Sequence, residues 1–79
     1  MITVYAIISD LNGCIYVGIA SDPDKRLEEH NKGKSKFTKA YRPWRTIYRE
    51  LQQDWESARK REKYFKSGIG KEFLKSLVP

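Results

Sequence analysis

The chain is poor in the residues that disulfides, metal clusters and membrane spans require. It has a single cysteine, Cys14, and a single histidine, His30. One cysteine makes no internal disulfide, and with one histidine it makes no Cys/His zinc cluster. No stretch reaches the roughly 18 apolar residues of a membrane span, and the first apolar run is short, alternating and without the basic start of a signal peptide. We therefore expect a protein of the reducing cytoplasm with no membrane association, in which Cys14 is a small strand residue.

Positive charge is in excess and is concentrated in one segment. The 79 residues carry a formal net charge of +6, and we expect them to form one domain over residues 1–79 with a small core. Between Asn31 and Pro43 there are five cations, no acid and two aromatic rings. Cations bind phosphate through counterion release and aromatic rings stack on unpaired bases, so this segment predicts nucleic-acid contact, although a solvated loop is the alternative. The candidate contact residues are Lys32, Lys34, Lys36, Phe37, Lys39, Tyr41 and Arg42.

A β-hairpin opens the chain. Asn12-Gly13 lies between two β-branched apolar runs, which favours a tight turn. Whether the turn has two or four residues, the register places Tyr5, Tyr16 and Gly18 on one face, because side chains alternate along a strand. We expect the opposite, wholly apolar face to enter the core. The first face then carries two phenols beside a glycine that leaves room for a ligand.

The remaining pattern predicts an α+β fold with the order β-β-α-β-α-α, in which helices pack on a small sheet. The expected strands cover residues 2–9, 14–20 and 44–51, and the expected helices cover 23–31, 55–67 and 71–77, with the basic segment as a loop. Along the third strand, alternation places Trp44, Thr46 and Tyr48 on one face.

The second long helix carries an unexpected polar residue. Helical spacing puts Glu62 in a stripe with Trp55, Ala58 and Phe65 that should pack on the sheet. A carboxylate at this position has three explanations: an ion pair, for example with Arg26; a place at an edge of the stripe that reaches water; or a role as ligand for a hard ion such as Mg²⁺.

Arg26 and His30 lie four residues apart on the first helix and share a face. They either flank the seam between helix and sheet or form a surface pair. Together with the two phenols and the helix carboxylate, this inventory suits phosphodiester hydrolysis. A cation polarises the phosphate, a base activates water, and a guanidinium neutralises the charge that develops.

These residues resemble the GIY-YIG endonuclease pattern over essentially the whole chain. Thr3-Val4-Tyr5 and Tyr16-Val17-Gly18 are similar to its two tripeptides, RLEEH to its R-x-x-x-H, and Glu62 to its helix glutamate. The stretch GKSKFTKAYRPW is similar to a small stand-alone bacterial branch, related to the amino-terminal nuclease domain of the excinuclease C subunit. Each tripeptide alone is weak evidence, whereas five matches in order are specific.

The resemblance implies a three-stranded antiparallel sheet flanked by helices and a metal-dependent DNA endonuclease, structure-specific or repair-related, with a single Mg²⁺ or Mn²⁺. By similarity, Glu62 would hold the ion, Arg26 would bind the phosphate and Tyr16 would orient water or phosphate. Tyr5 would act as general base or help to form it, His30 would assist proton movement, and Gly18 would keep the strand surface open.

The sequence leaves several alternatives open. A free phenol has a pKa of about 10, so Tyr5 serves as base only if positive charge lowers its pKa, and otherwise His30 must accept the proton. A non-catalytic nucleic-acid-binding module and a protein-interaction domain are the rival functions. DNA is the expected partner, together with a repair or recombination protein that targets the chain to its site. We expect the chain itself to be a monomer or a weak homodimer. No helix suits major-groove reading, so we expect DNA structure or single-strandedness to be recognised.

Overall fold

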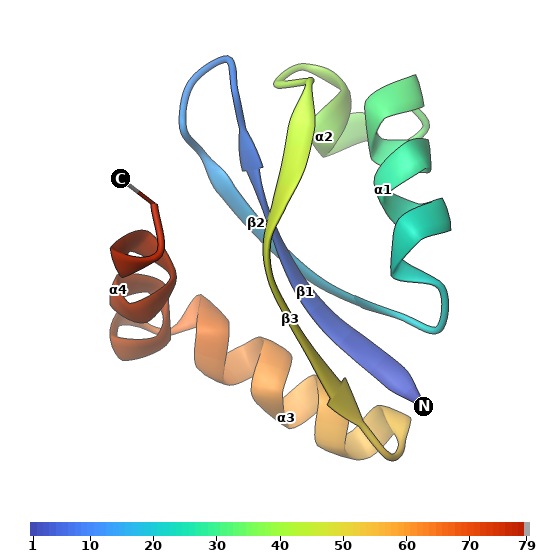
Figure 1. The fold of residues 1–79 in the computed structure, drawn as a ribbon, viewed down its shortest axis with the longest axis vertical. Helices are drawn as coiled ribbons and strands as arrows, with labels where there is room; N and C mark the ends of the chain where they lie inside the picture. Colours follow the sequence, from blue (N-terminus) through green and yellow to red (C-terminus); the bar gives the residue numbers. More distant parts are fainter. Residues whose placement is uncertain (79) are drawn as a thin grey trace.

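The computed structural model describes residues 1–78 and contains three strands and four helices (Figure 1). The elements are β1 (Ile2–Ser9), β2 (Ile15–Ala20), α1 (Pro23–Lys32), α2 (Lys36–Lys39), β3 (Trp44–Gln52), α3 (Trp55–Lys66) and α4 (Gly68–Ser76). The sheet is antiparallel with the order β2-β1-β3, so β2 is an edge strand. This α+β fold is the predicted one, except that the short helix α2 forms inside the basic segment. Among residues 1–78, no helix combines the length and the apolar character that crossing a lipid bilayer requires.

The hairpin between β1 and β2 closes with a four-residue turn. The amide of Ser9 donates to the carbonyl of Cys14 at 2.8 Å, and the amide of Gly13 donates back to Ser9 at 2.9 Å. Gly13 takes the positive φ of 76° that the turn requires. In this register Tyr5 lies opposite Gly18 and Ile7 opposite Tyr16, so the two phenols share one face as predicted.

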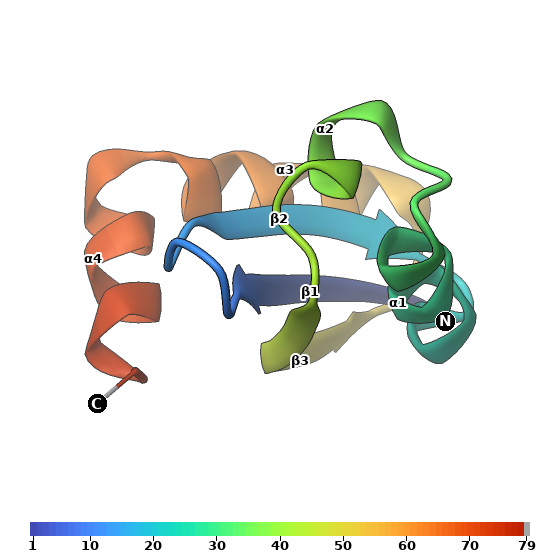
Figure 2. The ribbon, with the colours of Figure 1, turned by 90° about the horizontal axis from the view of Figure 1, so that it is seen from above.

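Both faces of the sheet are covered. Figure 1 shows α3 and α4 on one side of the sheet and α1 and α2 on the other, and Figure 2 shows α4 and α1 from above with the strands between them. The first side buries the predicted apolar face against α3 and α4, with the core residues Ile2, Val4, Ala6, Val17, Ala58, Phe65 and Leu74. The second side buries Tyr5, Ile7 and Trp44, with Leu27 and Tyr16 packed on them.

A β-bulge in β3 places Trp44 and Tyr48 on opposite faces of the sheet, whereas alternation predicted that they share one face. Ala6 pairs with Tyr48 but Ile7 pairs with Thr46, so Ile47 is the extra residue. Trp44 therefore lies on the side of Tyr5, whereas Tyr48 packs on Phe65 on the opposite side, with ring centroids 5.2 Å apart. Simple alternation failed here because a bulge shifts the parity of every residue beyond it.

The helix ends follow their capping residues. The side chain of Asp22 accepts from the amide of Lys25, and that of Asp54 accepts from the amide of Ser57. Gly33 ends α1 in the left-handed conformation, with φ of 82°. Trp55 is 47% exposed, so the stripe of α3 that packs on the sheet begins one turn later than predicted, at Ala58.

The final helix begins at Gly68, earlier than predicted, because the side chain of Ser67 caps it by accepting from the amide of Gly70. Glycine at position 70 then allows a close approach to the end of α3. Gly70 is buried, and a Cβ atom there would overlap the backbone of Tyr64 and Phe65, whereas a Cβ at Gly68 would meet nothing within 4 Å. We expect Gly70→Ala to lower the free energy of unfolding by about 1–3 kcal/mol. The matched change Gly68→Ala should leave it unchanged or raise it by up to about 1 kcal/mol. Urea unfolding measures both, and equal effects would contradict this packing.

Candidate active site

Three buried side chains from three elements form a chain of hydrogen bonds. The hydroxyl Oη of Tyr5, on β1, lies 3.0 Å from Nε2 of His30, on α1. The other ring nitrogen, Nδ1, lies 2.7 Å from Oγ1 of Thr38, on α2. Tyr5 is 3% exposed, and His30 and Thr38 are fully buried. His30 therefore lies inside the seam between helix and sheet, and the surface-pair alternative is wrong for it.

Thr38 is a residue that sequence reasoning missed. Its backbone carbonyl accepts a hydrogen bond from Nε1 of Trp44 at 2.8 Å. The side chain of Asn31 in turn bonds the backbone of Trp44 on both its amide and its carbonyl, at 2.6 and 3.0 Å. These bonds hold α2 against α1 and β3. A threonine among lysines has no sequence pattern that would have marked it, since its role depends on this docking.

Burial decides the protonation states of the chain of hydrogen bonds. Burial is the main cause that raises the pKa of Tyr5 to about 12; the neighbouring Tyr16 adds to the rise, and Arg26 opposes it without reversing it. Tyr5 as base requires a lowered pKa, and the positive charge of Arg26 does not by itself provide it. The choice between Tyr5 and His30 as base stays a prediction. Burial also lowers the pKa of His30, and Arg26 lowers it further, so its imidazole is neutral at pH 7 and able to accept a proton.

A buried neutral histidine predicts lower stability in acid. The pKa of His30 is lowered in the folded chain, so below the ordinary value of about 6.5 the unfolded chain binds more protons. We expect this residue to remove up to about 1.4 kcal/mol of unfolding free energy for each pH unit, from about pH 6.5 down to its folded pKa. Urea unfolding of wild type and His30→Asn between pH 8 and 5 measures the difference. Parallel curves for the two proteins would contradict the buried neutral state.

Tyr16 and Gly18 lie next to this chain of hydrogen bonds on β2. The ring of Tyr16 meets that of His30 edge-on, with centroids 5.1 Å apart, and lies 6.5 Å from the ring of Tyr5. A Cβ atom at Gly18 would be 2.5 Å from Oη of Tyr5. The expectation that Gly18 leaves room for a ligand is wrong, because the phenol of Tyr5 fills that space.

Arg26 and Glu62 approach the phenol from different helices. The charges of both act on Tyr5, that of Arg26 lowering and that of Glu62 raising its pKa. Arg26 is partly exposed and its Nη1 lies 3.1 Å from Oε1 of Glu29. The side chain of Glu62 is 25% exposed, and its Oε2 lies 3.2 Å from Nζ of Lys66. Glu62 is thus paired, but with Lys66 rather than with Arg26.

The donor set around Glu62 decides which ion the chain could hold. Within residues 1–78 no group of three or more His, Cys, Asp or Glu side chains that could hold a metal ion is gathered. A partly exposed single carboxylate fits a hydrated Mg²⁺ or Mn²⁺, which keeps several waters and takes its other ligands from a substrate phosphate.

The basic segment meets the site through its aromatic residues. The ring of Phe37 is 52% exposed and stacks on Tyr16 with centroids 6.0 Å apart, and Tyr41 lies against Phe37 at 5.6 Å. The segment is thus folded against the site, and the solvated-loop alternative is wrong for these rings. Lys32 pairs with Glu28 at 2.7 Å. The exposed cations here are Lys32, Lys34, Lys36, Lys39 and Arg42.

Comparison with known proteins gives related chains of similar size. Residues 1–73 match the family model described as GIY-YIG catalytic domain. UPF0213 proteins of Staphylococcus aureus strains Mu3 and Mu50 are each 39% identical over 57 residues, which is 71% of this chain and 70% of each relative. The solution NMR structure of the UPF0213 protein BH0048 from Bacillus halodurans is 32% identical with a TM-score of 0.57, over 99% of this chain and 86% of that one.

Proposed function

The chain belongs to the GIY-YIG family of nuclease domains, and from that membership we propose that it is a metal-dependent DNA endonuclease that hydrolyses phosphodiester bonds. The observation that carries the proposal is the buried hydrogen-bond chain of Tyr5, His30 and Thr38 beside Arg26 and Glu62. Folding does not require a neutral imidazole hydrogen-bonded to a phenol at this position. Hydrolysis does require a proton acceptor near a cation that binds the phosphate.

The proton path follows from the protonation states. In the proposed arrangement neutral His30 donates its Nδ1 proton to Thr38 and accepts from Tyr5 at Nε2. When water attacks the phosphorus, its proton passes to Oη of Tyr5 while the phenol proton passes to Nε2, so that Tyr5 never becomes a free phenolate. The bond between phosphorus and the leaving sugar oxygen breaks as the new one forms, and the leaving oxygen takes a proton from solvent. His30 is thus the base and Tyr5 the group that connects it to water.

Arg26 and Tyr16 position the substrate in this mechanism. Arg26 lines a hollow of about 320 Å³ between α1 and Trp55, from which a phosphate can approach its guanidinium. The guanidinium then neutralises negative charge on the phosphate in the transition state. The hydroxyl of Tyr16 orients the water or a phosphate oxygen.

Glu62 is the residue that would hold a single Mg²⁺ or Mn²⁺. The ion, when bound, would offset the charge that develops on the phosphate. The ammonium of Lys66 must leave the carboxylate oxygen that it now contacts. Removing that cation from the carboxylate exposes both oxygens of Glu62 to a hard ion, which prefers them to nitrogen ligands.

We also propose unpaired or branched DNA as the substrate, in a repair or recombination setting with a protein that targets the chain to its site. Cations follow the backbone and stacking on Phe37 requires a free base face, which a duplex does not offer. We assign none of the four helices of residues 1–78 to the reading of base edges in the major groove.

A nucleic-acid-binding module without catalysis is the second candidate. The Lys66–Glu62 ion pair favours it, because the carboxylate of Glu62, whose charge acts on Tyr5, is already neutralised. The basic segment serves either function equally well.

A nuclease assay separates the two candidates. Single-stranded, flapped, branched and duplex DNA of one shared sequence are incubated with the chain in Mg²⁺, in Mn²⁺ and in chelator. We expect cleavage only with an ion present, and faster at unpaired positions. Binding to these DNAs without cleavage in either ion would contradict the enzyme and support the binding module.

A further inference from the structure

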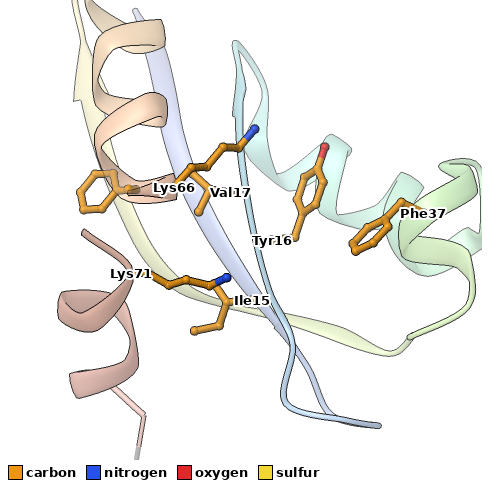
Figure 3. Close-up of a pocket in the computed structure, with 7 residues that line it drawn as sticks. Ile15, Tyr16, Val17, Phe37, Lys66 and Lys71 are labelled. Carbon is orange, nitrogen blue, oxygen red and sulfur yellow. The ribbon is translucent and has the colours of Figure 1, made fainter. Parts of the chain in front are cut away.

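A groove of about 320 Å³ opens beside Tyr16 along the edge strand β2 (Figure 3). Ile15 and Val17 of β2 and Phe65 of α3 give it an apolar lining. Figure 3 shows Phe37 on the side of α2, and the side chains of two lysines reaching in from the opposite side. The groove thus joins an aromatic wall to a cationic rim, next to a residue of the candidate active site.

We propose that this groove binds one unpaired nucleobase adjacent to the cleaved phosphate, and that Lys71 holds the next phosphate along the strand. This inference rests on the proposed function, since it names the part of the DNA that the same site recognises. None of the groove's lysines lies in the basic segment that the sequence singled out.

The aromatic wall supports a base as the occupant. Phe37 and Tyr16 lie with an interplanar angle of 30° and centroids 6.0 Å apart, so their rings form one stacked platform. Phe37 keeps 52% of its surface exposed, which leaves ring area free for a further aromatic partner. Successive bases stack on such side chains in proteins that bind single strands.

The cationic rim selects an anionic ligand. Nζ of Lys66 contacts Glu62 at 3.2 Å, and Lys71 is in no ion pair with any of residues 1–78. A purely apolar ligand would leave the Lys71 ammonium without a counter-charge, whereas a nucleotide supplies a base for the wall and a phosphate for the lysine. Charge and shape together therefore favour a nucleotide.

The size of the groove limits the occupant to a single base. Its volume is near the low end of small-ligand sites, about 300–1,000 Å³. A base must leave its stack to present a face to Phe37, which costs least for a base that is already unpaired. The groove therefore favours a single strand or a flap at the position next to the cut.

Fluorescence of a base analogue tests the inference without metal. A short single strand carrying 2-aminopurine at one position, moved stepwise along the strand, is titrated with the full chain in chelator. We expect a fluorescence change at a single position, and about 5- to 10-fold weaker binding for Phe37→Leu with loss of that change. Phe37→Trp should restore both, since it keeps a stacking face.

Lys71 has a matched control on the same helix. Lys71→Gln should reduce the salt dependence, the slope of log K against log salt, by about 0.7 for a single strand. Lys75→Gln should leave it unchanged, because Lys75 lies outside the groove and pairs with Glu72 at 3.6 Å.

The outcomes separate this inference from the proposed function. If Phe37→Leu binds DNA and changes fluorescence as the wild type does, and the wild type cleaves DNA, base binding in the groove is contradicted while the proposed nuclease activity is supported. A wild type that neither binds nor cleaves any DNA would overturn both. Competition by an acidic peptide as effective as by single-stranded DNA would make the groove a peptide site and overturn the inference.

Discussion

Replacing Tyr5 by phenylalanine should lower the cleavage rate by about 10²- to 10⁴-fold while DNA binding is retained. The change removes one oxygen and keeps the ring, so packing over Gly18 survives. Without the hydroxyl, water has no hydrogen-bonded connection to Nε2 of His30. Single-turnover cleavage and fluorescence anisotropy on the same flapped DNA measure the rate and the affinity separately.

Tyr48 provides the matched control for this change. It is another tyrosine of the sheet, but its hydroxyl donates to Glu50 at 2.8 Å on the opposite face. Tyr48→Phe should therefore leave the rate within about 3-fold of wild type, since it lies outside the candidate active site. Equal rates for Tyr5→Phe and wild type would show that the proton leaves the water by another path.

The hydrogen bond also contributes to stability, which the experiment must take into account. Tyr5→Phe leaves Nε2 of His30 buried without a partner, at a cost of about 1–3 kcal/mol. Urea unfolding of the variant gives this cost directly. Cleavage is then compared at a temperature where both proteins are folded, so that a lost rate is not mistaken for a lost fold.

Glu62→Gln should remove ion-dependent cleavage, with a rate loss of at least about 10²-fold. The amide keeps the size of the side chain but is neutral, and is therefore a weaker ligand of a hard ion than a carboxylate. In the wild type, Mn²⁺ should broaden NMR signals around Glu62 and Tyr5, and the variant should lose that broadening. Broadening that persists in Glu62→Gln would place the ion elsewhere.

Two variants on α3 show whether this effect is specific. Glu56→Gln removes an exposed carboxylate with a comparable partner, Lys60 at 3.9 Å, and should change neither cleavage nor broadening. Lys66→Gln should instead strengthen Mn²⁺ binding, since the ammonium no longer competes for the carboxylate of Glu62. Weaker Mn²⁺ binding in Lys66→Gln would mean that the lysine supports the site.

Local signals in the sequence were sufficient for most of the fold. Asn12-Gly13 fixed the hairpin parity, and the caps at Asp22 and Asp54 and the glycine at Gly33 fixed the helix ends. The bulge at Ile47 and the helix α2 were missed. Both depend on contacts with distant elements, which no short window of sequence contains.

The sequence predicted which residues lie close together but not the electrostatics around them, and their role as an active site stays a prediction. It placed Tyr5, Tyr16, His30 and Glu62 near one another. In the structure the rings of Tyr5, Tyr16 and His30 lie against one another, and the charge of Glu62 acts on Tyr5. The sequence could not reveal that Tyr5 is buried enough for its pKa to rise, because exposure depends on what α1 and α2 cover. For the same reason the partners Thr38 and Lys66 were not foreseen.

The bulge in β3 decides which change in that strand its neighbours can tolerate. Deleting the extra residue Ile47 would leave Ala6 opposite Tyr48 and Ile7 opposite Thr46 in a regular ladder. Trp44 would then stay opposite Ser9, with its indole within reach of the carbonyl of Thr38. A related chain that is one residue shorter at the bulge can therefore keep the same support for its imidazole, whereas a chain without an indole at the position of Trp44 must support it from a different neighbour.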